Sequence, residues 1–148
     1  MLFNVLKCKV MHLGYKNHGY SYRYYMDGKQ LDRGEEENGL EIIITKDLKV
    51  SQQCKQAYAK ASRMLGLINR SIKHKDRDIL HSLYKSLVRP HMEYCIPAWS
   101  PNYVKNKELI EWIQHRFTRM IPDLRRLPYL RRLQHTYWSL RKEKRQLN

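Results

Sequence analysis

The chain has 148 residues, of which 42% are hydrophobic and 29% charged, enough for one modest domain or a small domain with an appended piece. It contains no run of about 18 uncharged apolar residues, and Met1–Lys7 is too short for a secretory signal, so we expect an intracellular protein, nuclear or cytoplasmic, with no membrane partner. Cys8, Cys54 and Cys95 are widely spaced and odd in number, so we expect reduced, mostly buried thiols and neither disulfides nor a zinc site.

The formal net charge of +15 is concentrated in the second part of the chain. Residues 1–50 carry eight basic and seven acidic residues, whereas residues 51–148 carry 21 basic and seven acidic residues. A positive field of this size attracts polyanions, of which nucleic acid is the commonest. An anionic membrane surface, an acidic protein partner or a merely solvated basic face fits the same charge, so composition leaves these alternatives open.

The beginning of the chain has the short alternating pattern of β-strands. Residues 8–14 alternate apolar and polar side chains over most of their length. The Asp27-Gly28 pair is typical of a tight turn in which both central residues have positive φ. It predicts a small hairpin that pairs residues 22–25 with residues 29–31.

The next stretch is acidic and then β-branched. Residues 32–38 are rich in turn formers and include three consecutive glutamates, which indicates an exposed turn. Residues 41–45 predict a short buried strand, and residues 47–51 offer helix-capping groups. A hairpin and one short strand cannot form a stable sheet alone, so we expect this part to be the edge of something larger.

From Ser51 onward the apolar residues recur at spacings of three and four, which predicts α-helix. A first helix begins near Ser51, a second near Asp76 and a third spans residues 104–120, where Pro122 ends it. A fourth, over residues 128–145, ends mostly in charged residues. The side chains expected to face inward on the first three are Val50, Cys54, Ala57, Tyr58, Ala61, Met64, Leu65, Ile68, Ile79, Leu80, Leu83, Tyr84, Leu87, Val88, Leu109, Trp112, Ile113, Phe117 and Met120, and on the fourth Leu130, Leu133, Tyr137, Trp138 and Leu140.

Residues 84–101, called the proline segment below, separate the second and third helices. Pro90 lacks an N–H and disfavours helical geometry at Arg89, so the second helix is expected to end there. Pro97 and Pro101 bracket an Ala-Trp pair. The segment therefore predicts a stiff, buried corner between helices.

Catalytic groupings are not evident in the sequence. Glu35, Glu36 and Glu37 are consecutive in a glycine-flanked stretch and do not provide carboxylates held together on rigid elements, as two-metal phosphoryl chemistry requires. The seven histidines are scattered, without the His-x-x-x-His spacing and nearby glutamate of zinc enzymes, and no phosphate-binding glycine-rich loop occurs. We therefore expect neither a metal nor another cofactor.

The basic residues of the chain indicate nucleic-acid binding more clearly than any residues indicate catalysis. Arginine predominates near the end of the chain and suits bidentate phosphate contacts, although a solvated basic helix remains the alternative. No helix-turn-helix or zinc-finger pattern is present, so any contact is expected to be non-specific. The candidate nucleic-acid-binding residues are Lys55, Lys60, Arg63, Arg70, Arg116, Arg119, Arg125, Arg126, Arg131 and Arg132.

The proline segment contains SLVRPHMEYC at residues 86–95, followed by AWSP at 98–101. These residues are similar to the segment after the catalytic palm in reverse transcriptases of non-LTR (LINE-type) retrotransposons. Roughly residues 3–133 match in order. The other matching stretches are NVLKCKVMHLG at 4–14, YMDG at 25–28, IITKDLK at 43–49, ASRMLGLINR at 61–70 and IEWIQHRFTRMI at 110–121.

The resemblance implies the end of the palm, over residues 1–47, followed by a basic, helical thumb over residues 48–148. In that family the thumb holds the primer–template duplex mainly by its backbone, and the polymerising carboxylates and the fingers lie upstream of the matching stretch. Lys7 or Lys9 corresponds to a lysine thought to assist pyrophosphate release, which would be useless without the metal site. The chain departs from the family at Asn38-Gly39-Leu40-Glu41 and after Gln134.

We therefore predict an α+β chain, in which a small β-hairpin and short-strand palm remnant precede a thumb-like bundle of three or four helices. The predicted function is that of a truncated RNA-directed DNA polymerase that lacks catalysis and Mg²⁺, and at most binds an RNA/DNA duplex or a single strand. The alternatives are an adopted protein-interaction module, using an exposed β edge, or a fragment without a function.

Overall fold

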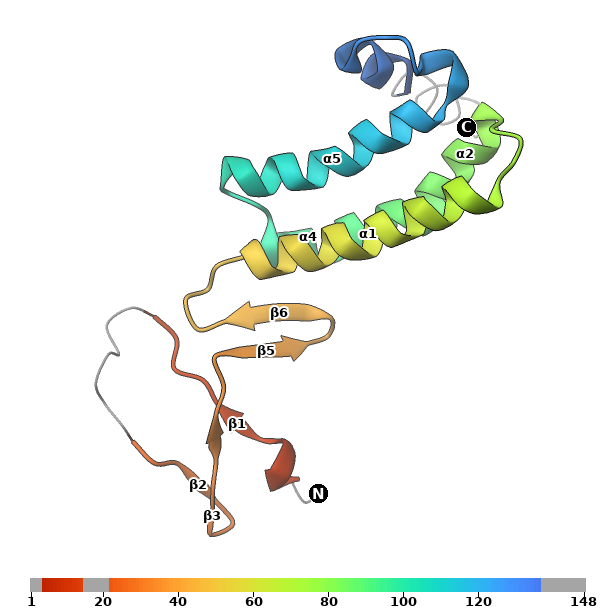
Figure 1. The fold of residues 1–148 in the computed structure, drawn as a ribbon. Helices are drawn as coiled ribbons and strands as arrows, with labels where there is room; N and C mark the ends of the chain where they lie inside the picture. Colours follow the sequence, from red (N-terminus) through yellow and green to blue (C-terminus); the bar gives the residue numbers. More distant parts are fainter. Residues whose placement is uncertain (1–3, 15–21, 137–148) are drawn as a thin grey trace, which may run out of the picture. The chain divides into compact units, whose positions relative to one another are not determined.

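The computed structural model describes residues 4–14 and 22–136, and these have the predicted α+β composition (Figure 1). Contacts divide the chain into two compact units, Met1–Gln53 and Cys54–Asn148. The division falls inside the first long helix, six residues after the boundary expected from the sequence. The predicted helical turns over residues 137–145 lie outside the described part of the chain.

The described strands of the first unit form three separate two-stranded sheets rather than one sheet. Each strand is only two to four residues long, so none of these sheets has a large face to bury. The parallel pair is β1 (Lys9–Val10) with β4 (Asp32–Arg33), and the antiparallel pairs are β2 (Tyr25–Met26) with β3 (Lys29–Gln30) and β5 (Glu36–Gly39) with β6 (Ile42–Thr45).

The predicted first hairpin is confirmed as β2–β3. Asp27 and Gly28 have φ of 52° and 75°, the two positive values that a tight hairpin turn requires. The Leu31 amide donates to the Tyr24 carbonyl at 2.8 Å, one residue pair beyond the assigned strands. The ladder itself is shorter than the predicted one.

The acidic stretch that the sequence indicated as a turn is a strand in the structure. β5 carries Glu36 and Glu37 and pairs with β6, and the turn lies at Leu40 and Glu41, which have φ of 50° and 63°. All of β5 is exposed and β6 is only partly buried, so the prediction of a buried strand was wrong. The β-branched residues of β6 favour a pairing that the glutamates of β5 alone do not.

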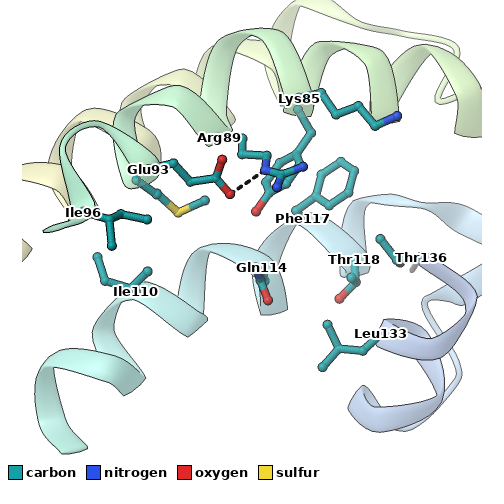
Figure 2. A pocket seen from close by; sticks show the side chains of 12 residues that line it. Lys85, Arg89, Glu93, Ile96, Ile110, Gln114, Phe117, Thr118, Leu133 and Thr136 are labelled. Carbon is teal, nitrogen blue, oxygen red and sulfur yellow. Dashed lines mark hydrogen bonds and ion pairs between the residues drawn. The ribbon is translucent and has the colours of Figure 1, made fainter. Parts of the chain in front are cut away.

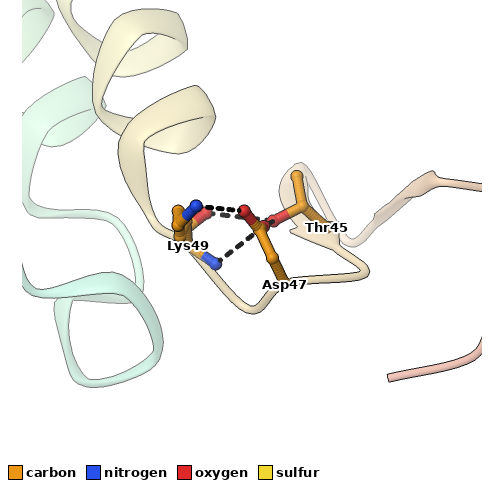
Figure 3. Close-up of polar contacts among 3 residues, drawn as sticks. All are labelled: Thr45, Asp47 and Lys49. Carbon is orange, nitrogen blue, oxygen red and sulfur yellow. Dashed lines mark hydrogen bonds and ion pairs between the residues drawn. The ribbon is translucent and has the colours of Figure 1, made fainter. Parts of the chain in front are cut away.

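A polar turn links β6 to the first helix, α1 (Ser51–Ser71), as Figure 3 shows. The Asp47 carboxylate accepts hydrogen bonds from the Thr45 hydroxyl at 2.7 Å and from the Lys49 amide at 3.2 Å. It also forms an ion pair with Lys49 Nζ at 2.9 Å. These contacts, led by those from Lys49 and Thr45, lower the pKa of Asp47 to about 2. Asp47 therefore organises the turn before the helix.

The second unit is built around one hydrophobic core. Ala61, Leu65 and Ile68 from α1 meet Ile113 and Phe117 from α5, and all five side chains are buried. The predicted third helix matches α5 at both ends. The helices are α1, α2 (Arg77–Leu83), the π-helical η2 (Tyr84–Val88), α3 (Arg89–Glu93), α4 (Ile96–Trp99), α5 (Val104–Met120), the 3-10 helix η3 (Pro122–Leu124) and the helical residues 129–136.

Four residues predicted to face inward are instead exposed. Ile79, Leu87, Trp112 and Leu130 keep 50%, 41%, 53% and 74% of their surface accessible to solvent. Each lies at the edge of an apolar stripe, and a helix that packs on one side buries only a band of its circumference. Spacing therefore identified the apolar band but overestimated its width.

The proline segment does not end the second helix at Pro90, which corrects the prediction. The backbone passes from α2 through η2 into α3, where Pro90 lies in the first turn and needs no N–H donor. The break comes at Cys95, whose φ is 53°. There the Trp99 indole donates to the Tyr94 carbonyl at 2.6 Å, and Trp99 is 3% exposed.

Candidate nucleic-acid interface

The predicted contact residues come from four segments of the second unit. Nearly all of them are exposed, Lys60 is half-buried and Arg132 is buried. Lys55, Lys60, Arg63 and Arg70 lie on α1, Arg116 and Arg119 on α5, Arg125 and Arg126 directly after η3, and Arg131 and Arg132 within helical residues 129–136.

Three of these arginines line one open hollow of about 900 Å³, called the basic hollow below. Arg119 reaches it from the last turn of α5, and Arg125 and Arg126 reach it from the turn after η3. Asn69, at the end of α1, and Lys75, in the loop before α2, also line it, and the Lys75 ammonium donates to Asn69 Oδ1 at 2.7 Å. None of the described residues that line the hollow is acidic, so its electrostatic field is positive.

Lys75 was missed by the sequence reasoning, although a signal was present. It follows Lys73 and His74 in a basic run immediately before Asp76, the N-cap of α2. The Asp76 side chain accepts from the amides of Asp78 and Ile79 and so fixes where the loop ends. The short basic loop between α1 and α2 was thus a candidate phosphate-binding site that the sequence already indicated.

Two of the predicted arginines make contacts inside the protein. Arg116 Nη1 donates to Ser62 Oγ at 2.6 Å and links α5 to α1. Arg132 is 3% exposed, contacts the His115 carbonyl at 3.4 Å and His115 Nε2 at 3.2 Å, and lies 5.5 Å from the centroid of the Tyr129 ring. Arg132 therefore braces α5 against residues 129–136 and is unsuited to the phosphate contact expected of it.

His115 shares this environment, and burial is the main cause that lowers its pKa, followed by the charges of Arg132 and Arg119. The imidazole is therefore neutral near pH 7. Its Nε2 faces the Arg132 guanidinium, which can only donate, so Nε2 is the acceptor and Nδ1 carries the proton. His115 thus adds no charge to the basic hollow.

The remaining predicted residues are not gathered at one place. The basic hollow is not lined by Lys55, Lys60, Arg63, Arg70, Arg116, Arg131 or Arg132. The exposed ones among them can extend a positive surface, which is what backbone contacts without sequence preference require. The hollow brings four basic side chains together, those of Lys75, Arg119, Arg125 and Arg126.

A second cavity, of about 250 Å³, lies between the proline segment and α5 (Figure 2). Its apolar wall includes Met92, Ile110 and Phe117. Arg89, at its edge, is bound to Glu93. Since an apolar lining offers little to a phosphate group, we leave this cavity out of the nucleic-acid interface.

We also searched the described residues for metal-binding groups and for reactive cysteines. Among them, no group of three or more His, Cys, Asp or Glu side chains is placed to hold a metal ion. Of the free cysteines, only Cys54 is buried, and burial raises the pKa of its thiol, so the expectation of mostly buried thiols was wrong for Cys8 and Cys95.

Within the described residues, no helix is both long enough and apolar enough to cross a membrane.

The chain was also compared with known proteins. Neither a protein-family model, nor a curated protein, nor a solved structure matches it.

Proposed function

We propose that this chain is a remnant of a non-LTR retrotransposon reverse transcriptase whose helical unit binds the backbone of nucleic acid and does not catalyse polymerisation. The basic hollow is the observation that carries the binding proposal. It gathers Lys75, Arg119, Arg125 and Arg126 without an acidic neighbour among the described residues that line it. The kinship rests on the ordered sequence resemblance alone.

The hollow suits phosphate groups better than it suits bases. Three of its four cations are arginines, whose planar guanidinium groups pair with two phosphate oxygens at once. Its described lining contains no aromatic ring on which a base could stack. Binding is therefore expected to follow the backbone and to depend strongly on salt concentration.

The absence of catalysis in this proposal rests on the arrangement of the carboxylates. Glu35, Glu36 and Glu37 are exposed at and beside β5, and Glu35 forms an ion pair with Lys46. Successive residues of a strand point to opposite faces, so this run does not hold two carboxylates together over one metal ion.

The alternative of a protein partner at the β edge has less support. The Gln53 side chain accepts from the Ile43 amide at 2.9 Å and donates to the Glu41 carbonyl at 3.4 Å. It therefore occupies one backbone amide of β6, that of Ile43, and one carbonyl of the turn before it, both of which a partner strand would need. Exposed Leu40 and Leu48 remain available to a partner that does not add a strand.

Fluorescence anisotropy with a labelled RNA–DNA duplex and a labelled single strand, over a salt series, tests the proposal. The triple variant Arg119→Gln, Arg125→Gln, Arg126→Gln is compared with Lys29→Gln, Lys105→Gln, Lys107→Gln, which removes the same charge from exposed positions elsewhere. If each arginine neutralises one phosphate, the slope of log K against log salt should fall by about 2–3 in the first variant only.

Absence of binding at low salt, or equal loss in both variants, would refute the proposed interface. Template-dependent DNA synthesis by the purified chain with Mg²⁺ would refute the proposed absence of catalysis.

A further inference from the structure

A third hollow, of about 200 Å³, lies on the side of α5 where two glutamates and two aromatic residues follow one another at helical spacing. Glu108, Glu111, Trp112 and His115 line it from successive turns of α5. Tyr129 completes it from helical residues 129–136. We call it the aromatic hollow, and the proposed nucleic-acid function makes no use of it.

The three rings of the aromatic hollow form inclined walls. The ring centroids of Trp112 and His115 are 5.3 Å apart with their planes at 60°, and those of His115 and Tyr129 are 4.7 Å apart with their planes at 51°. Rings inclined in this way present π faces and edges to a shared space instead of stacking on one another. Trp112 is 53% exposed, so the hollow is open to a ligand.

Two carboxylates give this hollow a charge opposite to that of most of the surface. The Tyr129 hydroxyl donates to Glu111 Oε1 at 3.1 Å, which fixes the carboxylate against the ring. Neither Glu108 nor Glu111 forms an ion pair with another described residue, although the chain carries about two basic residues for each acidic one. The charges of Arg132 and Arg119 act on His115 and oppose a second cation, but neither arginine lines the hollow, whose two charged lining residues are both glutamates.

We propose that the aromatic hollow binds an alkylated ammonium group, either as a small free cation or as the methylated side chain of a lysine. Aromatic faces attract cations of this kind, and the attraction grows when water is excluded. An alkylated ammonium is weakly hydrated and large enough to touch several rings, whereas a small metal ion requires a convergent shell of oxygen ligands. The carboxylates attract the positive charge of the ligand. The aromatic rings favour a cation whose nitrogen carries alkyl groups over one that carries only hydrogens.

The test titrates the full chain with choline and with 3,3-dimethyl-1-butanol, its neutral analogue of the same shape, at constant ionic strength. Backbone amide shifts of residues 108–115 report binding by NMR. Choline should give saturable shifts in the millimolar range, and the neutral analogue should bind at least about five-fold more weakly, as expected for a cation–π contribution of this size.

Two variants locate the ligand. Trp112→Ala removes one wall, and Glu111→Gln removes a charge while keeping an acceptor for the Tyr129 hydroxyl, so the second variant should retain the local structure. Both should weaken choline binding about five-fold or more, and Glu37→Gln on exposed β5, the matched control, should leave it unchanged.

A peptide with trimethyllysine is then compared with tetramethylammonium. About ten-fold tighter binding of the peptide identifies a protein side chain as the ligand, and equal binding identifies a small free cation; both results support the inference. Equal binding of choline and the neutral alcohol would overturn it. So would unchanged binding in both variants, or the absence of saturable shifts for every cation.

Discussion

Replacing Phe117 by alanine is expected to destabilise the second unit by about 3–5 kcal/mol. Phe117 is 2% exposed, stacks on Tyr84 with ring centroids 4.1 Å apart, and meets His81 edge-on at 5.5 Å. The loss combines the transfer of a large apolar side chain, the cavity that remains, and about 0.5–1.5 kcal/mol for an aromatic pair. A domain of about 100 residues has a total stability of roughly 5–15 kcal/mol, so the variant should be close to unfolding.

Urea denaturation followed by circular dichroism measures this effect because the second unit contains most of the helix. Phe117→Leu keeps much of the volume and should cost about 1–1.5 kcal/mol, which keeps the test informative where the alanine variant does not fold. Trp112→Ala is the matched control. Trp112 lies on the same helix and was predicted to be buried, but it is 53% exposed, so its loss should cost less than about 1 kcal/mol. Equal effects at Trp112 and Phe117 would refute the assignment of the core.

Two further predictions concern the first unit, at Asp47 and at Gln53. The pKa of Asp47 is held near 2 in the folded protein, against 3.8 for the unpaired carboxyl, so its stabilising contribution is fully present above about pH 4 and is lost as the pH falls toward 2. Asp47→Asn should reduce the acid dependence of the unfolding midpoint, and identical acid curves would contradict the prediction. Gln53→Ala removes one hydrogen bond to β6, at Ile43, and one to the preceding turn, at Glu41, and should cost about 1–2 kcal/mol, with faster hydrogen exchange at Ile43. Gln52→Ala, with one exposed contact to Glu36, is its control, and unchanged exchange at Ile43 would contradict the role of Gln53.

Helical periodicity predicted α5 at both ends because a long amphipathic pattern is a strong local signal and Pro122 marks its end. The hairpin at Asp27 and Gly28 was equally local. The pairing of β5 with β6 was harder to predict, since the glutamates of β5 favour solvent and the strand exists only because β6 binds it. Among the candidate binding residues, exposure followed from polarity, whereas the burial of Arg132 depends on His115 and Tyr129, which come from other turns.

The continuation of the helix through Pro90 shows why a local rule failed. Pro90 cannot donate a hydrogen bond, and in a regular helix its ring would meet the carbonyl four residues earlier. The preceding turn is π-helical, with the Arg89 amide donating to the Tyr84 carbonyl, and the Ser86 hydroxyl bonds to the Ser82 carbonyl at 2.9 Å. The wider turn relieves the ring clash, and the core contacts of Tyr84 and Val88 hold the chain in place on either side of it.

The placement of both proposed sites on α5 determines how they should be tested. Arg119 belongs to the basic hollow and Glu111 to the aromatic hollow, eight residues and therefore about 12 Å apart along the helix axis. The Debye length is about 8 Å at physiological ionic strength and about 30 Å at 0.01 M salt. The two hollows should consequently respond independently in physiological salt and influence each other at low salt. Duplex binding that strengthens choline binding only at low salt would fit separate sites of opposite charge, because the bound phosphates attract the cation. Weakened choline binding that persists at high salt would instead mean that both ligands occupy one surface.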